Sequence, residues 1–388
     1  MRYLILILFV LPLQISGQYT ISGTVSNTRG EHLSFATVYI PGTAYAASTD
    51  DHGKYIITDV APDQYTFIVK FVGYRVHTQD VTIHADQKID VVLQGEIYNL
   101  DAVEILANRV GQKGPFTKQN LSKETLLKEN LGQDVPFILQ WTPSMVVTSD
   151  AGTGIGYTGM RLRGSDQTRI NVTLNGVPVN EAESHNVFWV DLPDLMGSAQ
   201  SIQIQRGAGT STNGAGAFGG TVSINTAEVR VNPYVDIFST LGSFNTQKLS
   251  VHVGTGLIND RYVIDGRYST VHSDGYVDRA NARLNSLFFS AARVSSKSSL
   301  RLNVISGKEI TYQSWSGVPQ AKVDNNQEGL VSHYDRNVGS LYKSDADSVN
   351  LFASDRKYNY YSYANQIDNY RQTYVQLLHS LALKPNLK

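Results

Sequence analysis

Leu249-Ser250-Val251-His252-Val253-Gly254 alternates apolar with polar or small residues. A period of two is typical of a strand with one apolar and one polar face. The same alternation recurs, less cleanly in the fourth segment, at 235–241, 262–268, 300–304, 284–294 and 375–383. The sequence therefore predicts six strands of one sheet in the second half of the chain.

The connections between these strands alternate in length. Links 257–260 and 295–299 are short, whereas 272–282 and 310–369 are long; the short first link, 242–245, breaks the pattern. Transmembrane β-barrels have tight periplasmic turns and extended outer loops, whereas a soluble sandwich has no reason to sort its loops in this way. The pattern favours a barrel.

The N-terminus has the features of an export signal. Arg2 is followed by an apolar run, 3–13, and by the small residues Ser16 and Gly17, so residues 1–17 are predicted to be a signal peptide. The run is shorter than the roughly 20 residues of a membrane-spanning helix, and no later stretch is a candidate. Insertion into a membrane would then require a β-barrel.

Composition excludes several classes of function. The 388 residues carry 33 basic and 34 acidic side chains, a balance that argues against nucleic acid as a partner. The chain has no cysteine, which excludes disulfides, zinc–thiolate sites and thiol catalysis. No hydrolase or zinc-protease motif stands out, so we predict no enzyme, no catalytic residue and no cofactor.

Residues 18–95 are predicted to be a small β-sandwich. Five β-rich runs are separated by turn signals and lie at 21–25, 36–40, 54–58, 65–71 and 89–93. Asp50-Asp51-His52 has the residue types of a metal cluster, but a hairpin turn is favoured. The segment resembles the carboxypeptidase regulatory-like domain, which implies a non-catalytic seven-strand sandwich. The matching residues are Ser22-Gly23-Thr24-Val25, Ala36-Thr37-Val38, Thr49-Asp50, Gly53, Tyr55 and Gly73-Tyr74.

Residues 121–227 are predicted to be a mixed α/β unit. The expected elements are helices at 122–131 and 134–140 and strands at 160–163, 169–174, 201–206 and 221–225. Gly214, Gly216 and Gly219 fit G-x-G-x-x-G, but a strand follows where a dinucleotide site needs a helix. We interpret this glycine run as a place where backbones pack closely.

Several ordered motifs resemble the plug of TonB-dependent outer-membrane receptors, of a Bacteroidetes-like type with the N-terminal sandwich. The motifs are Leu100-Asp101-Ala102-Val103-Glu104-Ile105, Leu162-Arg163-Gly164, Leu174-Asn175-Gly176-Val177-Pro178-Val179, Gln205-Arg206-Gly207 and Asn213–Gly220. The resemblance implies a mainly β fold whose 22-stranded transmembrane barrel is filled by the plug. Residues 228–388 would supply its first six or so strands, and such an N-terminal fragment alone is not expected to transport.

The resemblance also implies a TonB box within the linker 96–120. The energy-transducing TonB protein would capture this box by strand addition. The alternative is an edge strand of the sandwich. The predicted box residues are Asp101, Ala102, Val103, Glu104, Ile105 and Leu106.

Further site residues follow from the resemblance. Arg163 and Arg206 would seat the plug by pairing with carboxylates of the barrel wall; otherwise they are solvated turn residues. Ligand-facing plug residues would be Tyr157, Glu181, Glu183, His185 and Trp189. The acidic pair and His185 alternate as metal ligands could, but an exposed polar loop is favoured, and no metal site is predicted. Ligand-facing barrel tyrosines, unless they only pack in the loop or line the aromatic girdle, would be Tyr358, Tyr360, Tyr361 and Tyr363.

The implied function is active uptake of a scarce solute across the outer membrane. An iron–siderophore or related iron complex is the first expectation, and a glycan importer of the same family is the alternative. A secreted β-rich adhesin is the rival from another class. The expected partners are TonB with its inner-membrane complex, outer-membrane lipid and a small ligand such as a metal chelate. The sandwich and the TonB box would lie in the periplasm.

Overall fold

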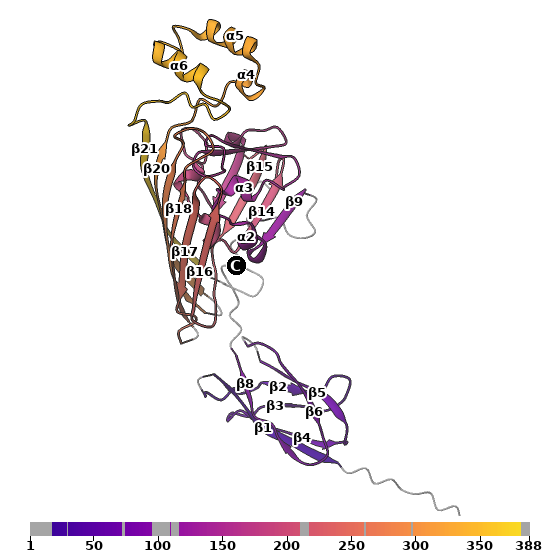
Figure 1. The fold of residues 1–388 in the computed structure, drawn as a ribbon. Helices are drawn as coiled ribbons and strands as arrows, with labels where there is room; N and C mark the ends of the chain where they lie inside the picture. The colour runs from indigo at the N-terminus through magenta and orange to yellow at the C-terminus, as the bar shows by residue number, and fades with distance from the viewer. Residues whose placement is uncertain are drawn as a thin grey trace, which may run out of the picture. The chain divides into compact units, whose positions relative to one another are not determined.

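The computed structural model describes residues 18–28, 30–71, 74–94, 109, 116–209, 217–259, 261–295 and 298–381. They belong to two compact units, residues 1–98 and 99–388 (Figure 1). The predicted signal peptide, 1–17, and the predicted TonB box, 101–106, lie outside the described residues.

The first unit is a two-sheet β-sandwich. One sheet has the order β4-β1-β7, with β8 also on β1, and the other has the order β3-β2-β5-β6. Its strands are β1 (Tyr19–Asn27), β2 (Thr37–Tyr39), β3 (Ala46–Ser48), β4 (Lys54–Val60), β5 (Gln64–Lys70), β6 (His77–Thr82), β7 (Gln87–Lys88) and β8 (Val91–Leu93). The prediction missed β3, β6 and β7, which lie at sheet edges and are largely exposed, so they carry no apolar alternation.

The turn at Asp50 is the predicted hairpin turn. Its carboxylate accepts hydrogen bonds from the backbone N–H groups of His52 (2.9 Å) and Lys54 (2.8 Å). Gly53 has a φ of +69°, and a Cβ there would lie 2.6 Å from the carbonyl oxygen of Val25. Asp and Gly therefore shape a turn at this point.

The second unit begins with the predicted mixed α/β part. Its sheet has the order β13-β12-β15-β14-β9, in which β12 and β15 are parallel, and a separate hairpin joins β10 to β11. The elements are β9 (Lys118–Ser122), α2 (Lys123–Glu129), α3 (Val135–Ile138), β10 (Met145–Ser149), β11 (Thr158–Leu162), β12 (Ile170–Leu174), β13 (Val177–Pro178), β14 (Ser201–Arg206) and β15 (Gly220–Asn225), with 3-10 turns η1 (Gln167–Arg169), η2 (Trp189–Asp191) and η3 (Leu195–Ser198). Both predicted helices and all four predicted strands are present.

The described end of the glycine run confirms close backbone packing. The N–H of Gly207 donates to the carbonyl of Gly219 (2.9 Å), whose own N–H donates to Arg169 (2.9 Å). A Cβ on Gly220 would lie 2.5 Å from Leu162. A strand, β15, follows the run, as predicted.

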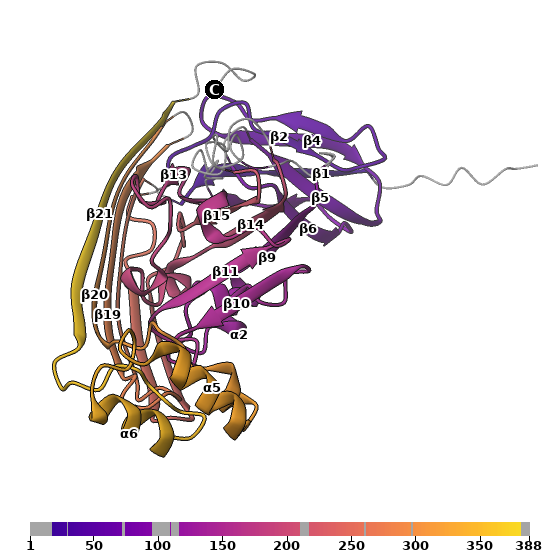
Figure 2. The ribbon, with the colours of Figure 1, turned by 90° about the horizontal axis from the view of Figure 1, so that it is seen from above.

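The remaining strands form one antiparallel sheet in sequence order, β16 to β21. They are β16 (Tyr234–Gly242), β17 (Thr246–Gly254), β18 (Tyr262–Ser273), β19 (Ala282–Val294), β20 (Ser298–Tyr312) and β21 (Ile367–Leu381). Figure 2 shows the sheet bowed around the α/β part. All six predicted strands are present. The short link 295–297 and the long link 313–366 lie at opposite ends, as predicted, but the short link 243–245 lies at the same end as 313–366, and the links 255–261 and 274–281 are nearly equal in length.

The link 313–366 contains helices that the prediction missed. They are α4 (Gln320–Val323), α5 (Gln327–Asn337) and α6 (Asp345–Ala353), and they lie beyond the ends of β20 and β21 (Figure 1). Helix α5 buries one leucine, Leu330, so its apolar periodicity is weak. The capping box of Ser344 and Asp347 at the start of α6 was a readable signal.

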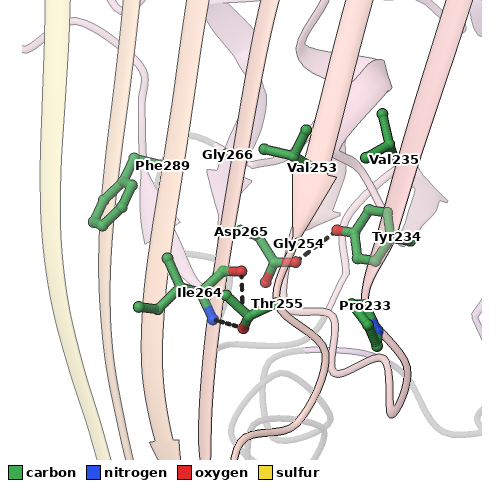
Figure 3. Close-up of a pocket in the computed structure, with 10 residues that line it drawn as sticks. All are labelled: Pro233, Tyr234, Val235, Val253, Gly254, Thr255, Ile264, Asp265, Gly266 and Phe289. Carbon is green, nitrogen blue, oxygen red and sulfur yellow. Dashed lines mark hydrogen bonds between the residues drawn. The ribbon is translucent and has the colours of Figure 1, made fainter.

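The sheet's outward face carries exposed apolar side chains. A hollow of about 660 Å³ on this sheet (Figure 3) is bordered by the exposed side chains of Val235, Val253 and Ile264. Gly266, which has no side chain to fill it, also lines it. Within the described residues, no helix has the length and apolar character needed to cross a bilayer.

Candidate functional site

A pocket of about 410 Å³ lies where the α/β part meets β20 and β21, near the strand ends that carry the long links. Both parts of the unit contribute to its wall. The lining residues are Tyr157, Pro178, Val179, Asn180, Glu181, Asn186, Phe188, Asp191, Glu309, Asp368, Tyr370, Gln372 and Tyr374.

The pocket is acidic. Four carboxylates line it, and none of the lining residues is Lys, Arg or His. Burial, together with the nearby charges of Asp368 and Glu181, raises the pKa of the Asp191 carboxyl to about 6. The lining therefore favours cationic or neutral solutes over anionic ones.

Tyr157 connects the two walls of the pocket. Its hydroxyl donates to Asp368 and lies 3.5 Å from Glu309. Its ring makes an edge contact with Trp315 of the long link, with centroids 5.2 Å apart. The tyrosine lies in the loop between β10 and β11, where Gly152, Gly154 and Gly156 all have positive φ, a conformation that glycine adopts without strain. A tight glycine loop thus presents Tyr157 to the sheet.

The same loop is bonded to the outer links. The carbonyl of Ala151 accepts the backbone N–H of Tyr276 (2.8 Å) in the link between β18 and β19. Asn359 of the long link donates to the carbonyls of Asp278 (2.8 Å) and Gln313 (3.0 Å). Three loops therefore form one hydrogen-bonded group beside the pocket.

The predicted ligand-facing plug residues divide into two groups. Tyr157 and Glu181 line the pocket, whereas Glu183 and His185 lie in an exposed turn. Among the described residues, no group of three His, Asp or Glu side chains is placed to hold a metal ion. Trp189 was wrongly expected to face a ligand: it is 1% exposed and belongs to the α/β core.

The predicted barrel tyrosines also separate. Tyr358 is 2% exposed and packs with Leu330, Tyr342 and Leu351 inside the long link, so the expectation that it faces a ligand is wrong. The neighbouring Tyr360 and Tyr361 make an edge contact with each other, and Tyr361 contacts Trp315. Tyr363 is 72% exposed.

Sequence reasoning missed three carboxylates of the pocket: Asp191, Glu309 and Asp368. Glu309 is buried at an inward position of β20. An acidic residue at an inward position near the outer end of a strand was the available signal. The signal is weak, because the residues of the α/β part that form the opposite wall of the pocket lie more than a hundred positions earlier in the sequence.

The seating contacts differ from the prediction. Among the described residues, neither Arg163 nor Arg206 pairs with a carboxylate of the sheet; Arg206 donates to the carbonyl of Pro143 (3.3 Å). In the buried ion pairs the acidic residue belongs to the α/β part and the basic residues belong to the sheet, the reverse of the prediction. Asp194 of the α/β part accepts from Lys248 (2.7 Å) and Arg267 (2.6 Å), which lie on β17 and β18.

Further polar groups complete this buried contact. Asn130 donates to Asp194 (2.8 Å), while Arg267 donates to Ser198 (2.7 Å) and Ser286 (3.0 Å). A second contact joins Asn175 to Gln376 of β21 (2.9 Å). Buried hydrogen-bonded groups thus fix the α/β part against at least three strands.

Comparisons with known families match two segments of the chain. The profile of the CarboxypepD_reg-like domain matches residues 21–105. The profile of the TonB-dependent Receptor Plug Domain matches residues 111–221. These segments overlap the predicted sandwich and plug.

Individual proteins show the same relationship. TonB-dependent receptor P39 of Formosa agariphila is 24% identical over 201 residues, which are 49% of this chain and 18% of that protein. The ferric-catecholate import receptor Fiu of E. coli K12 aligns in its open form with a TM-score of 0.52 at 14% identity, covering 70% of this chain and 37% of that one. Its closed form aligns with a TM-score of 0.51 at 14% identity, covering 72% and 36%. The chain spans less than two fifths of the length of these relatives.

Proposed function

We propose that this chain, which belongs to the TonB-dependent receptors, takes part in the active uptake of a scarce solute across an outer membrane. The observation that carries the proposal is the pocket shared by the plug and the inner face of β20 and β21. A solute bound there contacts both the plug, which is displaced during transport, and strands β20 and β21, which stay in place. Capture of residues 101–106 by TonB in the periplasm then displaces the plug. No bond of the solute is broken, so the protein is not an enzyme.

The first candidate solute is an iron complex whose net charge is neutral or positive. The structurally similar Fiu is described as a ferric-catecholate import receptor. In this chain, however, the residues that line the pocket include four carboxyl groups and no Lys, Arg or His. A negative charge about 6 Å from one ionised carboxylate costs about 3 kcal/mol at an effective dielectric constant near 20. The charge of the complex should therefore matter as much as its metal.

A glycan is the second candidate, and the lining of the pocket favours it. Tyrosine rings such as Tyr370 and Tyr374 offer faces for the apolar side of a sugar ring. The carboxylates can accept hydrogen bonds from its hydroxyl groups, and the amide of Gln372 can donate to them. An uncharged glycan also avoids the electrostatic cost of an anionic chelate.

Asp368→Asn is expected to weaken the binding of the solute at least tenfold. The change removes one pocket charge and replaces the charged acceptor of the Tyr157 hydroxyl by a neutral amide. Calorimetric titration of the purified protein with cationic, neutral and anionic ferric complexes and with neutral oligosaccharides would measure the effect. Asp335→Asn on the exposed face of α5 is the matched control. Equal affinity of the wild type for the anionic complexes would contradict the proposed selectivity.

Binding of a cationic solute is expected to weaken as the pH falls from 7 to 5. The pKa of Asp191 is raised to about 6, first by burial and then by Asp368 and Glu181, so this carboxyl is ionised above pH 6 and neutral below it. The other ionisable groups facing it are Tyr157, Glu309 and Tyr374. Asp191→Asn should flatten the pH profile between 5 and 7 while leaving binding of a neutral solute pH-independent. An unchanged profile in this variant would rule out Asp191 as the titrating group.

A further inference from the structure

Arg109 makes an unusual set of contacts for a residue that lies only three positions after the proposed TonB box. Its guanidinium donates to the hydroxyls of Ser201 (2.8 Å) and Ser223 (3.1 Å). It also donates to the backbone carbonyls of the same two residues, at 3.1 Å and 2.7 Å. One side chain thus holds four hydrogen bonds to the plug.

These bonds reach the interior of the plug sheet. Ser201 lies on β14 and Ser223 on β15, and in the order β13-β12-β15-β14-β9 both strands have neighbours on each side. Along the described part of the chain, by contrast, the first strand after the box is the edge strand β9, which begins at Lys118. Arg109 therefore bonds two inner strands eight positions before Thr117, whose backbone carbonyl accepts the N–H of Arg206 on β14 (3.0 Å).

The charge and geometry of the Arg109 guanidinium suit a contact that bears tension. Burial lowers the pKa of Arg109 to about 10, so the side chain stays charged at neutral pH. Hydrogen bonds from a charged donor are stronger than neutral ones. The planar guanidinium can reach two strands at once, which the single ammonium of lysine cannot reproduce. An edge strand pulled from its end can lose its bonds one after another, whereas this contact loads two strands together.

We propose that Arg109 is the positioning residue through which tension on the proposed TonB box first enters the plug sheet. The inference rests on the proposed function. According to this inference, tension on the box acts first on β14 and β15 and only later on β9. When the four bonds break, the segment 110–116 is drawn out next, until Thr117, whose carbonyl accepts the backbone N–H of Arg206 (3.0 Å), carries the force.

Single-molecule pulling on the bilayer-embedded protein tests this contact. A handle ahead of residue 101 is drawn away while the sheet stays in the membrane. The wild type should show an early rupture followed by an extension of less than about 25 Å, which is the length of seven residues at about 3.5 Å each before the distance already spanned between Arg109 and Thr117 is subtracted. Arg109→Lys and Arg109→Ala should lose this event while the later unfolding of the plug sheet keeps its force, which shows that the plug is folded.

Matched variants separate the contact from a general loss of stability. Ser223→Ala removes one of the four acceptors and should lower the rupture force without abolishing the event. Arg336→Lys on the exposed face of α5 should change nothing. An early event of unchanged force in Arg109→Ala would overturn the inference.

The test is independent of TonB. Binding of purified TonB to residues 101–106 is measured separately, in the wild type and in Arg109→Lys. If purified TonB did not bind residues 101–106 of the wild type, the proposed function would be refuted. If the wild type showed no early rupture, only the role of Arg109 would be refuted.

Discussion

Replacing Asp194 by asparagine is expected to destabilise the seating of the plug by about 3–5 kcal/mol, because it leaves two buried cations without their counter-charge. The side chain of Asp194 is fully buried, and those of Lys248 and Arg267 are 2% and 1% exposed. Water cannot replace the lost charge at this depth. The amide keeps the shape of the carboxylate, so the change isolates electrostatics from packing.

Hydrogen exchange of the plug amides measures this effect. A loss of 3 kcal/mol corresponds to about a hundredfold faster exchange, since every 1.4 kcal/mol is a factor of ten. Asp236→Asn is the matched control: its partner is Arg230, both side chains are partly exposed, and such pairs contribute about 0–1 kcal/mol. Equal exchange rates in Asp194→Asn and the control would show that the buried pairs do not hold the plug.

The same contact should tolerate mild acid. Burial alone would raise the pKa of Asp194, but Arg267 and Lys248 more than offset this and hold the pKa below its usual range. A carboxyl with a lowered pKa in the folded state stabilises the protein above its unfolded pKa of about 3.9, and this stabilisation is lost as the pH falls through the folded value. At pH 5, Asp194 should therefore still seat the plug, and acid that weakens solute binding should leave this contact intact.

Gly307→Ala is expected to cost about 2–3 kcal/mol, at the upper end of the range for overpacking a well-filled contact. A Cβ at this position of β20 would lie 2.1 Å from the carbonyl oxygen of Asp191 and 2.7 Å from the Cδ of Pro193. Both are backbone or ring atoms, so no side chain can rotate away. Either the plug segment or the strand has to move.

This displacement should be read most clearly at the pocket, because Asp191 lines it. We expect weaker binding of the solute together with faster hydrogen exchange in residues 188–192. Gly266→Ala is the matched control in the same sheet, since a Cβ there meets its nearest atoms only at 3.9 Å. If Gly307→Ala kept wild-type solute binding and hydrogen exchange, the contact between Gly307 and residues Asp191 and Pro193 would have enough space for a methyl group.

The sequence could predict only part of the candidate site. Tyr157 and Glu181 were expected at the ligand and do line the pocket, because they belong to loops whose position follows from the plug motifs. Trp189 and Tyr358 were expected there too, yet both are buried in apolar clusters. An aromatic residue in a predicted loop can face a ligand or close a small core, and local sequence does not distinguish the two.

The sequence by itself determined the six strands of the large sheet, the glycine turns and the division into sandwich, plug and sheet. These features are local: alternation of period two, turn residues and short motifs act between neighbours along the chain. Only the tertiary structure decided what holds the plug. Asp194 meets Asn130, Lys248 and Arg267 across 64, 54 and 73 residues of sequence. Arg109 meets Ser201 and Ser223 across 92 and 114. Such partners are chosen by the packing of the sheet around the plug, and no local pattern records them.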